Sequence, residues 1–373
     1  MDDGSARRLR YAVVGVGAGV LKVHRPALLS QDVELAAVTD INEEPGRSRA
    51  VEWGCDFYVD HRDMLADKLP EVCVILAPQP VHARIAIDCL EAGSHVLVEK
   101  PMAIRLDGAD AMIEAAREAR RLLAVNFQQR FRPEVRAAKR LIEDGELGDF
   151  QRVSMTHYWT RPAAYYETAP WRAVPAIEGG GLLMNQASHD LDLLCYLFGM
   201  PERIVAWTDT ILHDVEVEDT VQAMLRWTGG VFGSFYTSTA GAGDEPSIVI
   251  YGSAGRLRVF EGRLEFERFE VDLKEYAATE PDPFGQPSDP EPVEVELEAG
   301  LDGHLPVYRD LHEAILKGSS PMVDGVEGRK SLELANAMLY SNLVHEEVSL
   351  PLDRSRYASM LEELRAASVR KKS

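Results

Sequence analysis

The sequence of 373 residues is poor in cysteine and has no long apolar run. Its four cysteines form no CxxC pair, so we expect buried, reduced thiols at Cys55, Cys73, Cys89 and Cys195 rather than disulfides or a metal site. No apolar run approaches the ~20 residues that a membrane-spanning helix needs. The residues before Tyr11 contain no apolar core of the kind found in a signal peptide. We therefore expect a cytoplasmic protein with no membrane partner.

Positive charge is also scarce, with 40 lysines and arginines against 61 aspartates and glutamates. The formal net charge of −21 repels the phosphate backbone of DNA and RNA, which excludes nucleic acid as an expected partner. Hydrophobic residues at 46% and charged residues at 27% match a soluble globular protein. Because one hydrophobic core rarely extends over a chain of this length, we expect two domains.

The first predicted domain spans residues 1–128 and has an α/β pattern. Short apolar strands alternate there with helical stretches, which is typical of a parallel sheet flanked by helices. The predicted strands cover 11–14, 35–39, 72–76, 96–98 and 122–125, and the predicted helices cover 21–29, 83–92 and 108–119. The strand segments are continuous runs of Val, Ile, Leu and Ala, as expected for strands covered on both faces.

A glycine-rich turn follows the first predicted strand and precedes a predicted helix. It reads Gly15-Val-Gly17-Ala-Gly19, and glycines there let the backbone turn tightly and approach a pyrophosphate at the positive end of the helix. The third glycine stands one position earlier than in the common pattern. Asp40 ends the second predicted strand, where a carboxylate can bind both ribose hydroxyls of NAD. The alternative is that Asp40 only caps the following turn. NAD is the expected cofactor, and Arg47 leaves NADP open.

A longer stretch carries the candidate catalytic lysine. It includes Ala77-Pro-Gln-Pro-Val-His82 and Glu99-Lys100-Pro101, and it places Lys100 after a strand, at the sheet edge that faces the ligand crevice. Further motifs are Asn126-Phe-Gln-Gln-Arg130-Phe, Trp171-Arg172 and Gly179-Gly-Gly-Leu-Leu-Met-Asn-Gln-Ala-Ser-His189-Asp-Leu-Asp192. In this order the motifs closely resemble the Gfo/Idh/MocA family, named for glucose–fructose oxidoreductase, inositol dehydrogenase and a rhizopine catabolism protein. The resemblance extends over almost the whole chain.

The resemblance implies a Rossmann domain followed by an α+β domain, whose open, mostly antiparallel sheet often forms an oligomer interface. It implies hydride transfer between NAD(P) and a sugar or polyol, with Lys100 and His189 as the catalytic residues. The implied cofactor contacts are Gly15, Gly17, Gly19, Val20, Asp40, Ala77, Pro78, His82, Glu99 and Lys100. The implied substrate contacts are Lys100, Arg130, Trp171, Arg172, Asn185, His189 and Asp192. A homo-oligomer, either a dimer or a tetramer, is expected.

A helix over 185–197 would place three polar side chains on one stripe. Asn185, His189 and Asp192 stand at i, i+4 and i+7, with about 100° of rotation per residue. His189 suits proton transfer from a secondary alcohol because the reference pKa of imidazole is about 6.5. Lys100 can hydrogen-bond the same oxygen, and Asp192 can orient the imidazole or bind a substrate hydroxyl. A buried histidine with satisfied hydrogen bonds is the alternative for His189.

One position departs from the family pattern. Many members carry aspartate four residues before the histidine, whereas this chain has Asn185. An amide can hydrogen-bond a hydroxyl but cannot accept and release a proton, so Asn185 is assigned to substrate positioning. A branch of the family with Asn-Gln at this place includes enzymes that act on nucleotide sugars. The resemblance therefore implies sugar nucleotides as one substrate class.

The second predicted domain spans residues 129–373. Strands are expected over 152–158, 204–210, 220–227, 230–238 and 248–251, and helices over 308–316 and 327–345. Because helices do not separate these strands, an antiparallel sheet is expected. Residues 277–300 are acidic and rich in proline, which indicates an exposed excursion. The aromatic segment 159–172 is a candidate substrate lid, with a packed loop or an oligomer contact as the alternative. No metal is expected, because the histidines at 82, 95 and 189 are widely separated.

The sequence therefore predicts an NAD(P)-dependent oxidoreductase that acts on a secondary hydroxyl of a sugar, inositol or sugar nucleotide. Its central hypothesis is that Lys100 and His189 converge beside the reactive carbon of the nicotinamide. Two rival functions stay open. One is a glycosidase or lyase that uses tightly held NAD transiently, and the other is a non-catalytic sensor that binds NAD(P) and a protein partner.

Overall fold

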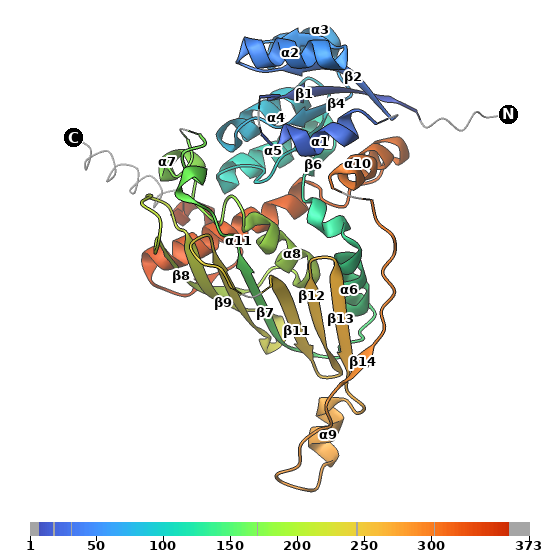
Figure 1. Ribbon diagram of the computed structural model, residues 1–373, viewed down its shortest axis with the longest axis vertical. Helices are drawn as coiled ribbons and strands as arrows, with labels where there is room; N and C mark the ends of the chain where they lie inside the picture. Colours follow the sequence, from blue (N-terminus) through green and yellow to red (C-terminus); the bar gives the residue numbers. More distant parts are fainter. Residues whose placement is uncertain are drawn as a thin grey trace, which may run out of the picture. The chain divides into compact units, whose positions relative to one another are not determined.

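The computed structural model describes residues 7–17, 19–30, 32–169, 171–243, 245–301 and 303–357. The chain forms two compact units, whose elements are labelled in Figure 1. The first unit comprises residues 1–128 and 301–332, and the second comprises residues 129–300 and 333–373. Among the described residues, no helix combines the length and the apolar character that crossing a bilayer would require.

A six-stranded parallel sheet forms the centre of the first unit. Its strands lie in the order β3-β2-β1-β4-β5-β6, and every neighbouring pair is parallel. The strands are β1 (Leu9–Val14), β2 (Val33–Thr39), β3 (Asp56–Tyr58), β4 (Val72–Ile75), β5 (His95–Val98) and β6 (Leu123–Val125). The order reverses between β1 and β4, and in such sheets ligands bind at this point, beside the carboxyl ends of the strands. The α/β Rossmann prediction for the N-terminal domain is confirmed.

Helices alternate with these strands along the chain (Figure 1). They are α1 (Leu21–Leu28), α2 (Glu43–Trp53), α3 (His61–Lys68), the 3₁₀ helix η1 (Gln79–Val81), α4 (His82–Glu91) and α5 (Leu106–Ala119). The sequence pattern did not reveal α2, β3 and α3. β3 has only three residues at the edge of the sheet, and none of them is fully buried, so it lacks the apolar run that marked the other strands.

Residues 301–332 correct the predicted domain division, which assigned them to the second domain. This segment includes α10 (Leu305–Lys317) and packs with the first unit. The Tyr308 hydroxyl on α10 lies 2.9 Å from His24 Nδ1 on α1. The Val125 N–H at the end of β6 donates to the Val323 carbonyl at 3.0 Å. The helical pattern of the segment could not show which sheet its apolar face would cover.

A nine-stranded sheet forms the second unit. Its order is β14-β13-β12-β11-β7-β10-β9-β8-β15, and only β7 and β10 pair in parallel. The strands are β7 (Phe150–Tyr158), β8 (Arg203–Asp209), β9 (Thr220–Arg226), β10 (Phe232–Ser238), β11 (Ser247–Gly252), β12 (Gly255–Phe260), β13 (Arg263–Arg268), β14 (Glu291–Val293) and β15 (Val348–Ser349). In β9, Val221, Ala223 and Leu225 are buried and the residues between them are exposed. The sheet is open and mostly antiparallel, as predicted.

The second unit also contains the helices that carry the predicted site residues. The remaining helices among the described residues are η2 (Gln128–Phe131), α6 (Pro133–Glu143), η3 (Ala163–Tyr165), α7 (Pro175–Glu178), α8 (Ser188–Phe198), η4 (Thr228–Gly230), α9 (Leu273–Thr279) and α11 (Gly325–Val344). The helix predicted over 185–197 begins later, at Ser188. Asn185 therefore lies in the preceding turn, and the predicted three-residue stripe is reduced to His189 and Asp192.

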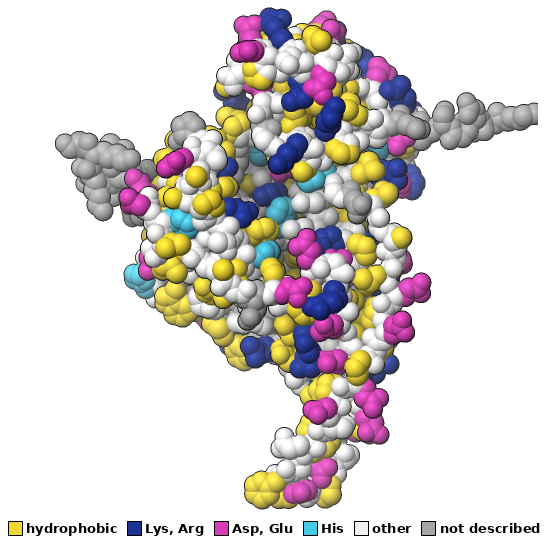
Figure 2. Space-filling view, in the orientation of Figure 1, with side chains coloured by type: hydrophobic (Ala, Val, Ile, Leu, Met, Phe, Trp, Pro, Cys, Tyr) yellow, Lys and Arg dark blue, Asp and Glu magenta, His cyan; other side chains and the backbone are white. Residues whose placement is uncertain are grey.

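Residues 277–300 are an exposed excursion, as their composition predicts, and β14 within them pairs with β13. The end of α9 lies in this segment, and most of its residues are exposed, with Phe284 at 87%. Figure 2 shows acidic side chains along it, in magenta. No disulfide joins the four cysteines, all of which lie within the described ranges. Cys73, Cys89 and Cys195 are buried and Cys55 is half-buried.

Candidate active site

The glycine turn ends β1 in the first unit and leads into α1. Gly15 has φ +94°, and a Cβ there would lie 2.5 Å from the Ala77 backbone nitrogen, so only glycine fits between these two loops. A Cβ on Gly17 would lie 3.0 Å from the Asp40 carboxylate. By contrast, no described heavy atom lies within 4 Å of a Cβ built on Gly19. The turn is packed on its inner side and open at Gly19, just before Val20 at the start of α1, which fits a bound pyrophosphate.

Asp40 connects the end of β2 to the glycine turn. Its carboxylate accepts hydrogen bonds from the Gly17 N–H at 2.7 Å and from the Asn42 N–H at 2.9 Å. The alternative role of Asp40, capping the following turn, is therefore present in the structure. A carboxylate has about four acceptor positions, so this bonding leaves capacity for ribose hydroxyls. The Arg47 guanidinium is held by Glu43 at 2.8 Å and lies 5.0 Å from the Phe57 ring.

His82 braces the loops that follow β4 and β5. Its Nε2 lies 2.6 Å from the Ala77 carbonyl, and its Nδ1 lies 3.0 Å from the Pro101 carbonyl. The side chain is buried, and burial lowers the pKa of His82. The ring thus fixes the Ala77-Pro78 loop beside Gly15 and, at the same time, the turn that follows Lys100.

Lys100 stands at the carboxyl end of β5, directly after the buried Glu99. Three donors reach the Glu99 carboxylate: His24 Nε2 at 2.8 Å, the Asn126 side-chain amide, and the Lys100 backbone N–H at 3.2 Å. Burial alone would raise the pKa of Glu99, but the hydrogen bonds from His24 and Asn126 and the charge of Lys100 lower it to about 2. Glu99 is therefore ionised at neutral pH and supplies a fixed negative charge behind the lysine.

Tyr308 extends this hydrogen-bond network. Its hydroxyl lies 2.9 Å from His24 Nδ1. Burial raises the pKa of Tyr308 well above its ordinary value, so the phenol keeps its proton and can donate it to His24. His24 Nε2 donates its hydrogen to Glu99, so Tyr308 contacts one ring nitrogen of His24 and Glu99 contacts the other. The segment 301–332 thereby supports the carboxylate that adjoins Lys100.

His304 completes a group of ligand-type side chains that the sequence spacing did not reveal. His24, Glu99 and His304 each place one nitrogen or oxygen within 4.8 Å of the others. Burial lowers the pKa of His304 to about 4, helped by the charges of His24 and Lys100. The 2.8 Å between His24 Nε2 and Glu99 Oε1 is a hydrogen-bond distance, because two tetrahedral zinc ligands with bonds of about 2.0 Å stand roughly 3.3 Å apart. We interpret the contact between His24 and Glu99 as a hydrogen bond, and the His304 ring lies against His24 with the centroids 4.5 Å apart.

In the second unit, α8 carries His189 and Asp192. Arg130 on η2 holds Asp192 through two hydrogen bonds, Nε to Oδ2 at 2.9 Å and Nη2 to Oδ1 at 2.7 Å, and each side chain is 1% exposed. The guanidinium also lies 4.9 Å from the centre of the Tyr196 ring. Because a bidentate buried pair is rigid, it fixes α8 one turn beyond His189. His189 itself is 9% exposed.

Asn185 lies in the turn before α8, between a carboxylate and an arginine. Its side-chain nitrogen donates to Glu178 Oε1 at 2.5 Å and to the Gly181 carbonyl at 3.0 Å. Its side-chain oxygen lies 3.4 Å from Arg172 Nη1. Arg172 in turn stacks at 4.7 Å on the Trp171 ring. The predicted substrate residues Trp171, Arg172 and Asn185 therefore form one contiguous group in the second unit.

Two buried glutamates flank the triple glycine and were not identified from the sequence. Glu218 accepts hydrogen bonds from the N–H groups of Gly181 at 2.8 Å and Leu183 at 2.9 Å. Burial raises the pKa of Glu218 to about 7, and the nearby charge of Glu178 contributes. Burial also raises the pKa of Glu178. Glutamates outside a motif are usually exposed, so only their burial distinguishes these two.

The aromatic segment is anchored at its start by Asp190, the residue after His189. Asp190 Oδ1 accepts from His157 Nδ1 at 2.9 Å, and Oδ2 accepts from Trp159 Nε1 at 2.8 Å. The His157 and Trp159 rings stack with their centroids 3.8 Å apart. This part of the segment is a packed loop, which supports that alternative for Trp159.

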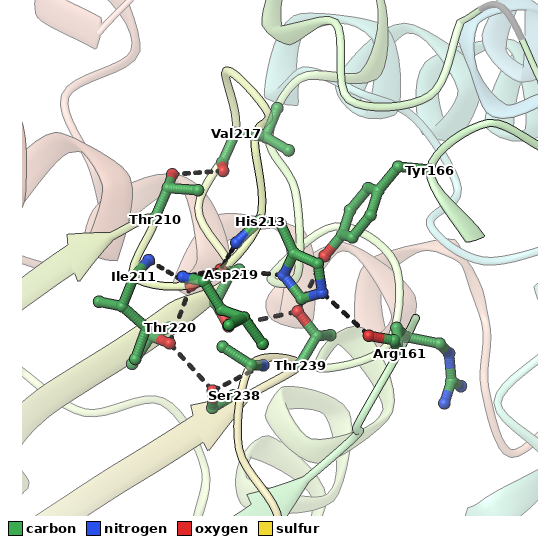
Figure 3. Close-up of polar contacts among 12 residues, drawn as sticks. Arg161, Tyr166, Thr210, Ile211, His213, Val217, Asp219, Thr220, Ser238 and Thr239 are labelled. Carbon is green, nitrogen blue, oxygen red and sulfur yellow. Dashed lines mark hydrogen bonds and ion pairs between the residues drawn. The ribbon is translucent and has the colours of Figure 1, made fainter. Parts of the chain in front are cut away.

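A second anchor centres on Asp219 and His213 (Figure 3). The carboxylate of Asp219 is fully buried and accepts from the N–H groups of Ile211, Leu212 and His213, and from His213 Nδ1 at 2.9 Å. His213 Nε2 lies 2.9 Å from the Arg161 carbonyl. This chain of contacts ties the loop between β8 and β9 to the beginning of the aromatic segment, and thereby restrains the segment that leads to Arg172.

Comparison with known proteins defines the class of the molecule. Residues 9–127 match the family described as "Oxidoreductase family, NAD-binding Rossmann fold", and residues 135–258 match "GFO/IDH/MocA C-terminal domain". The first unit, with its Rossmann sheet, open glycine turn and lysine at the carboxyl edge, is therefore the NAD-binding domain of an oxidoreductase. The chain belongs to the Gfo/Idh/MocA family, so the predicted family, enzyme class and cofactor are confirmed.

Named relatives are dehydrogenases. The chain is 25% identical over 342 residues to myo-inositol 2-dehydrogenase of Thermotoga maritima, covering 88% of this chain and 95% of that protein. It is 28% identical over 223 residues to levoglucosan dehydrogenase of Pseudarthrobacter phenanthrenivorans, covering 53% of this chain and 57% of that protein. The WlbA dehydrogenase of Bordetella pertussis, solved with NADH and UDP-GlcNAcA, superposes with a TM-score of 0.81 at 31% identity, covering 94% and 99% of the two chains.

Proposed function

We propose that the protein oxidises a secondary hydroxyl of a sugar nucleotide with NAD, or carries out the reverse reduction. Free sugars and inositols are the other substrate classes that the sequence predicts. The observation that carries the proposal is the Glu99–Lys100 arrangement at the carboxyl edge of a Rossmann sheet, where a buried carboxylate adjoins the candidate lysine. The choice of a sugar nucleotide is supported by the 31% identity to a dehydrogenase solved with UDP-GlcNAcA, and by the Asn185-Gln186 pair.

The proposal gives each predicted residue a chemical role. NAD, when bound, supplies the hydride acceptor. Lys100 donates a hydrogen bond to the substrate oxygen and stabilises the negative charge that develops on it. His189 takes the hydroxyl proton as the C–H hydride leaves, so that the alcohol becomes a ketone. The backbone of the glycine turn and the Asp40 carboxylate hold the cofactor.

The sheet of the second unit supports a homo-oligomer as part of the proposal. Trp207, Met224 and Phe232 lie on β8, β9 and β10 and are 58%, 46% and 54% exposed. The register places Trp207 opposite Gln222 and Met224 opposite Ser234, so these side chains share one sheet face. An exposed apolar face of this kind suits a second copy of the chain, in a dimer or tetramer. Light scattering of the purified protein measures the number of copies in the oligomer. As a separate part of the proposal, we place the enzyme in the cytoplasm.

A substrate screen tests the proposed reaction. NADH formation is followed by absorbance with UDP-sugars, free sugars and inositols, and the wild-type protein should give net turnover with at least one UDP-sugar. Lys100→Met should lower kcat by roughly 10²–10⁴-fold while NADH binding, read by fluorescence, is retained. Lys317→Met, at an exposed site on α10, is the matched control. Near-normal turnover of Lys100→Met would remove the lysine from the mechanism.

The same screen separates the two rival functions. A glycosidase or lyase that uses NAD transiently would release product without accumulating NADH. A non-catalytic sensor would bind NADH and give no product with any substrate in the screen. Net NADH accumulation in step with ketone formation contradicts both.

A further inference from the structure

The surroundings of Asn185 determine which end of its side-chain amide faces Glu178. The two hydrogens of the Asn185 amide point at acceptors, Glu178 Oε1 at 2.5 Å and the Gly181 carbonyl at 3.0 Å. Exchanging the amide nitrogen and oxygen would bring the oxygen against two other oxygens. The Asn185 side-chain oxygen therefore faces away from Glu178, on the side where Arg172 Nη1 lies at 3.4 Å.

Glu178 is itself held rigidly enough to impose this orientation. It is 1% exposed, and its Oε2 accepts from the Ala173 N–H at 2.6 Å. Its Oε1 lies 3.9 Å from Arg172 Nη1, so the guanidinium is near both Glu178 and Asn185. Glu178 ends α7 and Gly179 follows it with φ +82°, a conformation that favours glycine. The chain thus reverses direction immediately after the carboxylate, towards the turn that carries Asn185.

The geometry points to Glu178 as the residue that positions Asn185 as a hydrogen-bond acceptor for a substrate hydroxyl. This inference rests on the proposed function, because it assumes that Asn185 contacts the substrate. The sequence resemblance implies aspartate at this position in many family members. In this chain the amide oxygen of Asn185 takes the acceptor role, and the negative charge lies on Glu178, which the Asn185 amide contacts.

Charge explains why the two positions are coupled. A carboxylate at position 185 would face Glu178 across a hydrogen-bond distance in a buried site that also contains Glu218. Arg172 is the cation that the structure places at both Glu178 and Asn185. Two carboxylates at such a distance do not both stay ionised, so one would be protonated. The raised pKa of Glu178 and of Glu218 shows that this site already disfavours negative charge.

We predict that aspartate at position 185 lowers activity in this chain unless Glu178 is replaced at the same time. Asn185→Asp should lower kcat/KM by about 10²-fold, because like charges meet and the Gly181 carbonyl loses its donor. Glu178→Gln should lower it about tenfold, since one acceptor towards the Asn185 amide remains. In the double variant, the new amide donates to the new carboxylate. The double variant should therefore recover at least tenfold over Asn185→Asp alone.

The experiment measures the four proteins with the UDP-sugar found in the screen, and Gln286→Glu controls for adding a carboxylate at an exposed position. A double variant no more active than Asn185→Asp, or an Asn185→Asp protein within threefold of wild type, overturns the inference. The thermal unfolding midpoints of the same proteins test the contact between residues 178 and 185 independently of catalytic activity. If wild type turns over no substrate, the proposed function fails, and the pairing is then tested by unfolding alone: it fails if the double variant unfolds no later than Asn185→Asp.

Discussion

The Asp40 carboxylate accepts a hydrogen bond from the Gly17 backbone N–H at 2.7 Å, so the acid at the end of β2 is part of the glycine turn itself. The same carboxylate receives the Asn42 N–H at 2.9 Å. The sequence analysis treated ribose binding and turn capping as alternatives for Asp40. One carboxylate has enough acceptor positions for both, and the contact with Gly17 places its charge beside the turn that would hold the pyrophosphate.

Replacing this charge should change the cofactor preference. In Asp40→Asn the Gly17 N–H can still donate to the amide oxygen, whereas the Asn42 N–H loses its acceptor and the charged acceptor for the ribose is lost. We expect kcat/KM for NAD to fall about 10- to 100-fold, the equivalent of one charged hydrogen bond of about 1.5–3 kcal/mol. The NADP to NAD ratio of kcat/KM should rise, because a 2′-phosphate no longer meets a carboxylate. Asp63→Asn, exposed on α3, is the control, and an unchanged ratio in Asp40→Asn would contradict the role.

Parts of the structure that follow from local patterns could be predicted from the sequence. The buried strands of the first sheet are runs of branched apolar residues, and β9 alternates with period two, so both were recognisable. The parallel pairing of β7 with β10 was not, because strand neighbours are chosen by contacts remote in sequence. For the same reason α10 was assigned to the wrong unit. Its Tyr308 meets His24, which is 284 residues away along the chain.

In the candidate site, too, some residues could be recognised from the local sequence and others depend on contacts that are remote in the chain. Gly15, Asp40 and Lys100 stand at strand ends, and this placement is visible in the sequence. The roles of Glu178 and Glu218 depend on burial, and a glutamate carries no sign of burial when its partners are backbone N–H groups. Asn185 was predicted on a helix because its spacing to His189 is four residues, but α8 begins at Ser188 and the turn before it fixes Asn185 instead.

Tyr308 and Tyr11 offer a matched test of the network behind Lys100. Both tyrosines are buried, but the Tyr308 hydroxyl bonds His24, whereas the Tyr11 hydroxyl has no hydrogen-bond partner among the described residues. Tyr308→Phe should lower the free energy of unfolding by about 1 kcal/mol and reduce kcat several-fold, because the His24 ring that donates to Glu99 loses its second hydrogen bond. Tyr11→Phe should leave both unchanged. Urea unfolding and steady-state kinetics check this, and equal effects of the two variants would show that the contact between Tyr308 and His24 does not support Glu99.

His95 predicts a loss of stability of the first unit in mild acid. Its Nδ1 accepts the Leu122 N–H at 2.9 Å, so a proton at Nδ1 would break this bond. Burial lowers the pKa of His95 from 6.5 to about 4, and the charge of Arg121 contributes. A histidine whose folded pKa is depressed stabilises the fold fully above pH 6.5, and this stability is lost as the pH falls from 6.5 towards 4.

The measurement for His95 is the free energy of unfolding in urea at pH 7.5, 6.0 and 5.0. One depressed histidine contributes a slope of up to about 1.4 kcal/mol per pH unit within that window. His95→Gln can keep an acceptor for the Leu122 N–H but does not titrate, so its slope should be smaller than that of wild type. His345→Gln, at an exposed position, should retain the wild-type slope. Identical slopes for wild type and His95→Gln would show that this histidine does not control the acid response.

The last prediction concerns the anchor formed by Asp219 and His213. Asp219→Asn keeps the shape of the side chain but replaces one acceptor oxygen with an NH₂ group that faces backbone N–H donors. We expect the free energy of unfolding of the second unit to fall by about 3–5 kcal/mol at pH 7, as when one partner of a buried pair is removed. Urea unfolding of wild type and Asp219→Asn at pH 7 measures this loss.

Asp209→Asn is the control for this prediction, because Asp209 is exposed at the end of β8 and its loss should change stability by less than about 0.5 kcal/mol. Burial would raise the pKa of Asp219, but the hydrogen bonds from Ile211, His213 and Leu212 lower it below the ordinary value of 3.8. The stability that Asp219 supplies is therefore complete above pH 3.8 and is lost only in stronger acid. The difference between wild type and Asp219→Asn should stay constant from pH 5 to 8, and a difference that shrinks at pH 5 would contradict the lowered pKa of the carboxylate.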